Sequence, residues 1–167
     1  MKKFKNDNKG FTLVEMIVVL VILAILAAIL VPALLGYIDE AKQKQYELHG
    51  KSVYTAAQAV ASECYAKGTL PSAYTDFETR VQTISEIATF GTTTGAYVEF
   101  EKPSDSATDQ KTNHAYYTVK SVYYYEDGTW VKLSTDTNGA SSWTKVTITA
   151  APSNTIKITG KGTFPIS

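Results

Sequence analysis

The chain has 167 residues, and its sixteen Lys and Arg balance its sixteen Asp and Glu, so the formal net charge is zero. A neutral chain has no bulk electrostatic attraction for nucleic acid or for an anionic membrane surface. The single cysteine, Cys64, excludes an intramolecular disulfide scaffold. The length fits one small globular domain with an additional segment.

The N-terminal segment combines a basic start with a long apolar run. Residues 1–10 hold four lysines and one aspartate, whereas residues 16–38 hold no charged residue. A helix of the twenty residues from Met16 to Leu35 would span about 30 Å, the thickness of the hydrocarbon core of a bilayer. Because the lysines precede the run, the N-terminus is expected in the cytoplasm and residues 37–167 outside the membrane.

Three interpretations of this segment compete. A secretory signal peptide would have an apolar core of only about 7–15 residues. A plain single-span anchor explains the length and the lysines, but it does not explain the carboxylate of Glu15 at the mouth of the run. Cleavage between Gly10 and Phe11 would remove the lysine-rich start and place a new amino group one helical turn from Glu15. This interpretation explains both the lysines and the carboxylate.

The stretch from Lys9 to Glu15 reads KGFTLVE, and with the apolar run after it this stretch resembles the class III signal of type IV prepilins. The resemblance implies that a prepilin peptidase cleaves after Gly10 and methylates the new N-terminal Phe11. It also implies filament assembly through Phe11 and Glu15, because the amine of one subunit can pair with the carboxylate of another in a low-dielectric helix bundle. The alternative is an interfacial glutamate that reaches the headgroups.

The same resemblance implies the partners and the location. A homo-oligomeric helical filament would be built by an assembly machinery with a cytoplasmic ATPase. The subunit would wait in the cell membrane as a single-pass protein and end in an extracellular pilus on the cell surface. The filament could serve adhesion, twitching motility, aggregation or DNA uptake, as a major or a minor subunit. The chain could also be a pseudopilin of a type II secretion or competence system, or a membrane-anchored surface protein that never polymerises.

Many Gram-negative pilins close a C-terminal loop with a disulfide, which this chain cannot form because it has no cysteine after Cys64. This departure favours a Gram-positive source.

The helix is expected to continue beyond the membrane-length run. Pro32 removes a backbone hydrogen bond and predicts a kink near residues 28–32. Apolar residues then recur at helical spacing, which predicts one buried face, and a stop is expected at Lys67-Gly68. The buried face comprises Tyr46, Val53, Ala57, Val60 and Cys64. The expected parts are a leader (1–10), a transmembrane or filament-core helix (11–36), an amphipathic continuation (37–67) and a globular head (68–167).

The head is expected to be α+β, with an antiparallel sheet packed on the second half of the long helix. Thr75 to Glu78 resembles a capping box that starts a short helix at 75–89. Period-two patterns then predict strands, and Asp127-Gly128 predicts a two-residue hairpin turn. Asn138-Gly139 predicts a further turn, and Pro103 to Asn113 a polar loop. The expected strands are Ala96–Glu101, Tyr116–Glu126, Thr129–Ser134, Trp143–Thr149 and Thr155–Thr159.

The sequence predicts neither an enzyme nor a cofactor or metal site. His49 and His114 are far apart and are expected to face solvent. Cys64 on the apolar helical face is expected to be a buried structural thiol. Asp136 to Gly139 begins like a calcium loop but lacks the closing glutamate, so it predicts a turn. No basic stripe indicates nucleic-acid binding.

Tyrosines crowd one expected strand. Alternation would place Tyr117, Tyr123 and Tyr125 on one face and Tyr116 and Tyr124 on the other. Core packing with cross-strand pairing is the favoured interpretation. An exposed aromatic patch at a subunit interface or binding surface is the alternative.

Overall fold

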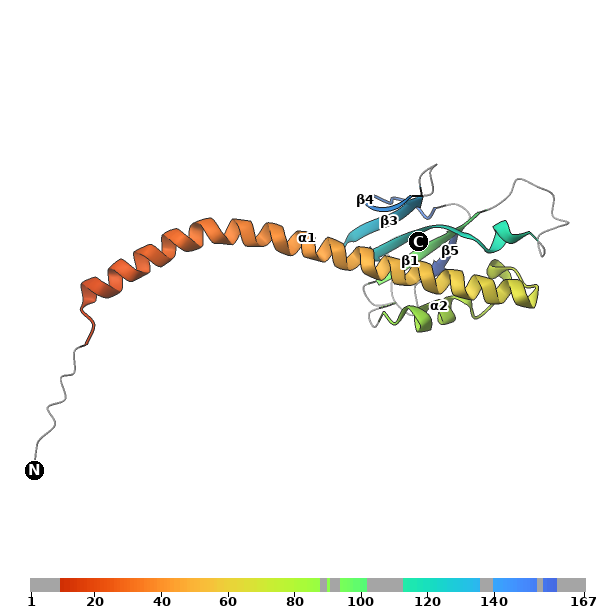
Figure 1. The fold of residues 1–167 in the computed structure, drawn as a ribbon, viewed down its shortest axis with the longest axis horizontal. Helices are drawn as coiled ribbons and strands as arrows, with labels where there is room; N and C mark the ends of the chain where they lie inside the picture. The colour runs from red at the N-terminus through yellow and green to blue at the C-terminus, as the bar shows by residue number, and fades with distance from the viewer. Residues whose placement is uncertain are drawn as a thin grey trace, which may run out of the picture. The chain divides into compact units, whose positions relative to one another are not determined.

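The computed structural model describes residues 10–87, 90, 94–101, 113–135, 140–152 and 155–158. The chain divides into two compact units, Met1–Lys42 and Gln43–Ser167. One helix, α1 (Leu13–Lys67), contributes its first part to the first unit and its second part to the second. Figure 1 shows α1 and the sheet that accompanies its second part.

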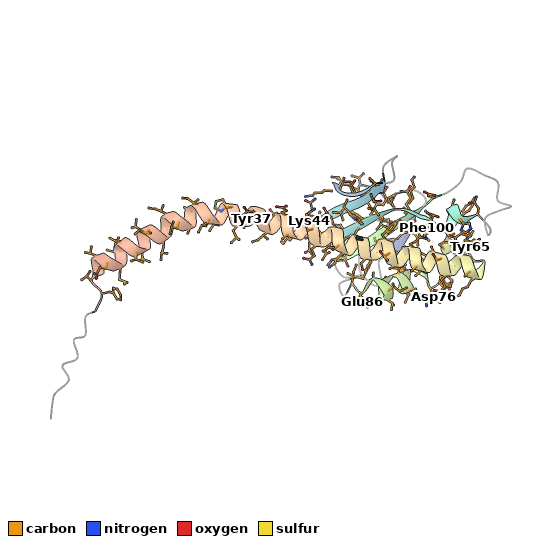
Figure 2. The ribbon with its side chains drawn as sticks, viewed as in Figure 1. Tyr37, Lys44, Tyr65, Asp76, Glu86 and Phe100 are labelled. Atoms are coloured by element: carbon orange, nitrogen blue, oxygen red, sulfur yellow. The ribbon has the colours of Figure 1, made fainter. Side chains whose placement is uncertain are left out.

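In the first unit, α1 is a helix without cover from the described chain. Every described side chain from Gly10 to Lys42 is exposed, and Figure 2 shows side chains projecting from all sides of the helix up to Tyr37. The helix assignment continues through Pro32, so a kink at this proline stays a prediction.

In the second unit, one face of α1 is buried, as the sequence predicts. Tyr46, Val53, Ala57, Val60 and Cys64 are each at most 6% exposed. The helix ends at Lys67, as expected, and Gly68 follows with a φ of 64°. The N–H of Gly68 donates to the carbonyl of Tyr65, and that of Thr69 to the carbonyl of Cys64. This pair of bonds is a Schellman motif, which only a residue with an accessible left-handed conformation completes at low cost.

The short second helix exists, but it begins later and ends earlier than the expected 75–89. A 3₁₀ turn, η1 (Pro71–Ala73), precedes α2 (Phe77–Ser85), which begins after Asp76 rather than Thr75. The helix thus begins one residue later than a capping box from Thr75 to Glu78 would require, and the side chain of its N-cap residue, Asp76, makes no capping hydrogen bond. The carbonyl of Tyr74 accepts from the N–H of Phe77 instead. The preceding turn thereby satisfies a donor that a cap would otherwise serve.

Within the described residues, the sheet has five antiparallel strands in the order β4-β3-β2-β1-β5. The fold class is therefore α+β, as predicted. The expected loop at 103–113, apart from Asn113, and the expected turn at Asn138-Gly139 lie outside the described residues. The strands are β1 (Thr94–Phe100), β2 (Val119–Glu126), β3 (Thr129–Thr135), β4 (Ser141–Val146) and β5 (Thr155–Ile158).

The second strand is shorter than predicted. A 3₁₀ helix, η3 (His114–Tyr117), replaces the expected first residues of β2. The side-chain amide of Gln58 on α1 donates to the carbonyl of Tyr117 at 3.0 Å and accepts from the N–H of Val119 at 2.9 Å. Gln58 thus supplies the backbone partners that a neighbouring strand would supply at this point.

The tyrosines of β2 divide between the two faces of the sheet. Tyr124 is fully buried in the core against α1, whereas Tyr123 and Tyr125 are half-buried on the other face. Tyr117 is also buried, but it lies in η3, so its predicted place in the strand alternation is wrong. On the face away from the core, Trp130 stacks on Tyr97 with ring centroids 5.8 Å apart. The aromatic residues therefore contribute to packing on both faces.

Candidate functional site

The N-terminus of α1 is closed by a reciprocal pair of hydrogen bonds between Thr12 and Glu15. The backbone N–H of Thr12 donates to Oε2 of Glu15 at 2.7 Å, and the Thr12 hydroxyl donates to the same oxygen at 2.8 Å. The N–H of Glu15 in turn contacts the Thr12 hydroxyl oxygen at 3.3 Å. This arrangement is a capping box, in which two donors of the first helical turn find partners within the chain.

The capping box gives the Glu15 carboxylate two donors from Thr12 of the same chain, in addition to the Phe11 amine of another subunit that the sequence predicts. The signal was present in the sequence, because Thr12-Leu13-Val14-Glu15 has the Thr-x-x-Glu spacing directly before an apolar run. A carboxylate has about four acceptor positions, so the two bonds from Thr12 leave capacity for another donor.

The residues around the predicted cleavage site are accessible. Phe11 is 81% exposed, and among the described residues no atom beyond Gly10 and its chain neighbours lies within 4 Å of the position that a Cβ on Gly10 would occupy. Residues 1–9, with the lysine-rich leader, lie outside the described residues. Gly10, Phe11 and Glu15 therefore lie close together in sequence at an open helix end, while their roles in cleavage, methylation and assembly stay predictions.

The apolar run that follows is the largest exposed hydrophobic surface described for the chain. The large apolar side chains from Leu13 to Ile38 are between 42% and 74% exposed. By length and composition, α1 is the one described helix able to cross a membrane, and its most apolar window is 0% buried. An apolar surface of this extent marks a membrane or protein contact.

Two comparisons with known proteins found matches to this chain. Residues 5–31 match the family described as the prokaryotic N-terminal methylation motif. The chain is also 36% identical over 63 residues to the type IV major pilin protein PilA of Myxococcus xanthus, a match that covers 38% of this chain and 29% of that protein. The chain thus spans less than a third of the curated relative that it matches. No solved structure matches it.

The family match covers the stretch from Lys9 to Glu15. Both matches support the resemblance to type IV prepilins that the sequence carries there. The expected Gram-positive source finds no support in them.

The other candidate residues have structural surroundings. His49, expected to face solvent, instead lies half-buried on α1, with Nδ1 2.7 Å from Oε2 of Glu126. The buried Tyr124 hydroxyl donates to the same oxygen at 2.8 Å. Burial and the neighbouring Glu126 carboxylate both raise the pKa of Tyr124. This cluster links α1 to the end of β2.

His114 and Cys64 have simpler environments. His114 is exposed in η3, and its Nε2 lies 3.1 Å from the hydroxyl of Tyr65. Cys64 is buried as predicted, and burial raises the pKa of its thiol. Among the described residues, no group of three or more His, Cys, Asp or Glu could hold a metal ion. Asp136 to Gly139 lies outside them.

Proposed function

We propose that this protein is the structural subunit of a type IV pilus, which polymerises through its N-terminal helix into a surface filament. The observation that carries the proposal is the apolar part of α1, exposed on all sides and begun by the Thr12–Glu15 capping box. Such a helix needs lipid or other helices around it. The methylation motif at residues 5–31 and the similarity to a type IV major pilin support the same function.

The proposed life of the subunit has two stages. The chain inserts with its N-terminus in the cytoplasm and waits as a single-pass membrane protein. A prepilin peptidase removes residues 1–10 by cleavage after Gly10 and methylates Phe11. The assembly machinery, driven by a cytoplasmic ATPase, then extracts the subunit. Residues 11–36 become the filament core, 37–67 the amphipathic continuation and 68–167 the outer head.

Assembly exchanges lipid contacts for helix–helix contacts. Because lipid tails are as apolar as leucine, this exchange alone gives little preference for one axial register. The Phe11 amine of a neighbouring subunit, paired with Glu15, would supply that preference, since an ion pair in low dielectric depends strongly on distance. Thr12 would hold the carboxylate in place for this pairing. Pro32 would allow the helix to kink or loosen as it enters the filament.

The proposal can be tested by separating the charge of Glu15 from its capping role. Glu15→Gln keeps a capping-box acceptor but removes the charge, whereas Glu15→Val removes both. We expect both variants to reach the membrane and both to yield far fewer sheared filaments than the wild type. The charge-matched control Glu40→Gln, beyond the apolar run, should assemble normally.

The outcomes distinguish the alternatives. Normal filaments from Glu15→Gln with none from Glu15→Val would assign Glu15 to capping and contradict the register role. Unchanged surface display of all variants, without filaments in the wild type, would favour an anchored surface protein that never polymerises. A processed chain that is confined to membranes would favour a pseudopilin.

A further inference from the structure

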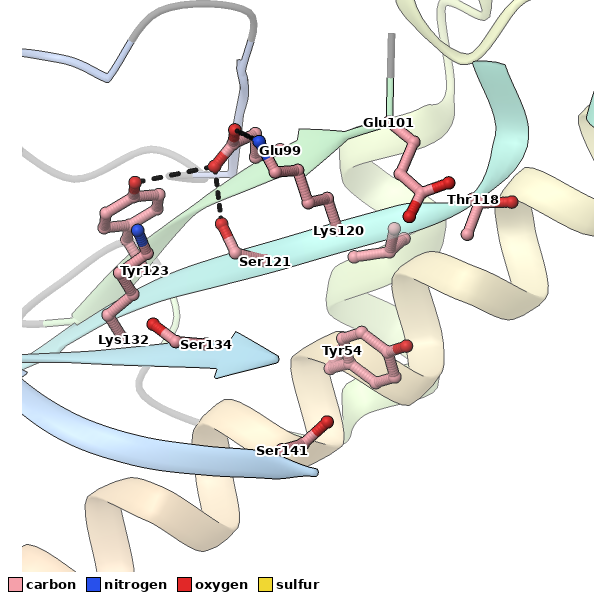
Figure 3. Close-up of a pocket in the computed structure, with 11 residues that line it drawn as sticks. Tyr54, Glu99, Glu101, Thr118, Lys120, Ser121, Tyr123, Lys132, Ser134 and Ser141 are labelled. Atoms are coloured by element: carbon pink, nitrogen blue, oxygen red, sulfur yellow. Dashed lines mark hydrogen bonds and ion pairs between the residues drawn. The ribbon is translucent and has the colours of Figure 1, made fainter. Parts of the chain in front are cut away.

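A polar pocket lies at one end of the sheet, in the second unit and separate from the assembly segment. Its volume is about 590 Å³, within the range typical of small-molecule sites. It lies where β1 and β3 end and where β2 and β4 begin, with Tyr54 of α1 at one side (Figure 3). Antiparallel pairing brings these four strand ends together, although they are far apart in sequence.

The pocket is organised around the carboxylate of Glu99. Its oxygens accept from the hydroxyl of Ser121 at 2.6 Å and from the ammonium of Lys120 at 3.0 Å. Figure 3 shows these side chains and Tyr123 converging on Glu99. The register of β1 and β2 shifts between Glu99 and Phe100, and such a bulge re-aims side chains locally. These hydrogen bonds therefore hold the side chains of Glu99, Lys120 and Ser121 in place.

The charges of the lining determine the kind of ligand that fits. Among the described lining residues, two carboxylates, Glu99 and Glu101, face two ammonium groups, Lys120 and Lys132. The balance disfavours both an anionic and a cationic ligand, because either would meet a like charge. It suits a neutral ligand that offers both donors and acceptors.

The remaining lining is rich in hydroxyl groups and includes two aromatic rings. The ammonium of Lys132 covers the Tyr123 ring, 4.7 Å from its centroid, whereas Tyr54 lies across the pocket from Glu99 (Figure 3). A pyranose has hydroxyls that pair with such groups and an apolar C–H face that can pack on a tyrosine ring. The hydroxyl-bearing residues are Tyr54, Thr118, Ser121, Tyr123, Ser134 and Ser141.

We propose that this pocket binds a neutral saccharide, with Glu99, Lys120 and Lys132 as hydrogen-bonding partners of its hydroxyls and Tyr54 as its packing surface. The inference goes beyond the proposed pilin function and does not depend on it. All the described lining residues belong to one subunit, so binding can be measured without filaments.

The test uses the full chain, ¹⁵N-labelled, in a detergent that has no sugar headgroup. Glucose, galactose, mannose, N-acetylglucosamine and N-acetylgalactosamine are titrated separately and followed by NMR. We expect at least one sugar to give saturable shifts confined to the pocket residues, with a Kd of about 1 mM, which is ordinary for a ligand of this size. Ser134→Leu, which fills the pocket, should weaken binding at least about tenfold. The exposed control Lys145→Ala should bind like the wild type.

Three results would overturn the proposal. One is the absence of saturable shifts from every sugar. Another is binding that Ser134→Leu leaves unchanged while its spectrum remains that of a folded chain. The third is saturation of the same residues by sodium phosphate and by none of the sugars, which would indicate an anion site. Loss of filament assembly in other variants has no bearing on any of these readouts.

Discussion

Gly50 shows how a single residue fixes the contact between α1 and the edge of the sheet. It is buried, and a Cβ built on it would lie 2.5 Å from Cη2 of Trp143 on β4. Glycine costs a helix about 1 kcal/mol relative to alanine. Because Gly50 has no side chain, the indole ring of Trp143 can pack directly on the helix backbone.

Gly50→Ala should therefore destabilise the head, although alanine is the better helix former. Overpacking of this kind costs about 1–3 kcal/mol, which exceeds the gain in helix propensity. Trp130 and Trp143 are the two tryptophans of the chain, so fluorescence during urea unfolding of the detergent-solubilised protein reports on the head.

The double variant Gly50→Ala/Trp143→Leu provides the control, because the smaller leucine makes room for the methyl group. We expect the alanine to cost less free energy of unfolding in that background than in the wild type. Equal costs in both backgrounds would show that Trp143 does not set the requirement for glycine.

Gln58 connects α1 to the start of β2 through two backbone hydrogen bonds. Gln58→Ala would leave the Tyr117 carbonyl and the Val119 N–H without these partners, at a cost of about 1–3 kcal/mol. The matched control is Gln82→Ala, since Gln82 bonds to Glu78 within its own helix. Equal unfolding free energies for the two variants would refute this role for Gln58.

Glu99 gives the head a predictable response to acid. Burial raises the pKa of the Glu99 carboxyl, but the hydrogen bonds from Ser121 and Lys120 outweigh burial, so the pKa lies below its usual value. The unfolded state then binds more protons. The contribution of Glu99 is therefore present above the unfolded-state pKa of about 4.3 and is lost as the pH falls through the folded-state pKa.

We expect the free energy of unfolding of the wild type to fall on acidification below about pH 4.3. In Glu99→Gln it should be lower at neutral pH and change less over the same range. Urea titrations between about pH 3 and pH 7 measure both. An acid dependence of Glu99→Gln as steep as that of a Glu101→Gln control would contradict this account.

At the scale of the elements, the hairpin between β2 and β3 depends on its turn. Asp127 and Gly128 both have positive φ, 46° and 82°, which is the requirement of a type I′ turn. Gly128→Ala forces a Cβ into this conformation and should cost about 1 kcal/mol. Asp127→Gly should be close to neutral by the same reasoning. Urea unfolding of the two variants measures the difference, and a reversed order would contradict the turn assignment.

The elements that the sequence predicted best are those with a local physical cause. The stop at Gly68, the buried face from Tyr46 to Cys64 and the Asp127-Gly128 turn each follow from a residue type at a fixed spacing. The start of α2 depends on the 3₁₀ turn directly before it, whereas the start of β2 depends on contacts between distant segments. Gln58, for example, contacts residues 59 and 61 positions away, and no single-sequence pattern indicates such a contact.

The candidate functional residues also divide into those with a local sequence signal and those brought together only by folding. The motif from Lys9 to Glu15 could be recognised from the sequence because its residues are adjacent. The capping role of Thr12 follows from the same local spacing, whereas at Thr75 to Glu78 the 3₁₀ turn before α2 competes for the donor. The pocket around Glu99 could not be predicted, since four strand ends and α1 build it only after folding.

At the scale of the whole molecule, the two units differ in whether their apolar side chains are buried. The second unit buries its apolar residues against its own sheet, whereas the first exposes an apolar helix. An exposed helix of this kind is unfavourable in water, so we propose that a bilayer or copies of the chain surround residues 11–36. This is the central claim of the proposed function.

The intact mass of the protein in filaments sheared from the cell surface tests that claim most directly. The account predicts an abundant species with the mass of residues 11–167 plus one methyl group, because processing after Gly10 precedes assembly. A chain found only in membranes and still carrying residues 1–10 would contradict both the processing and the polymerisation.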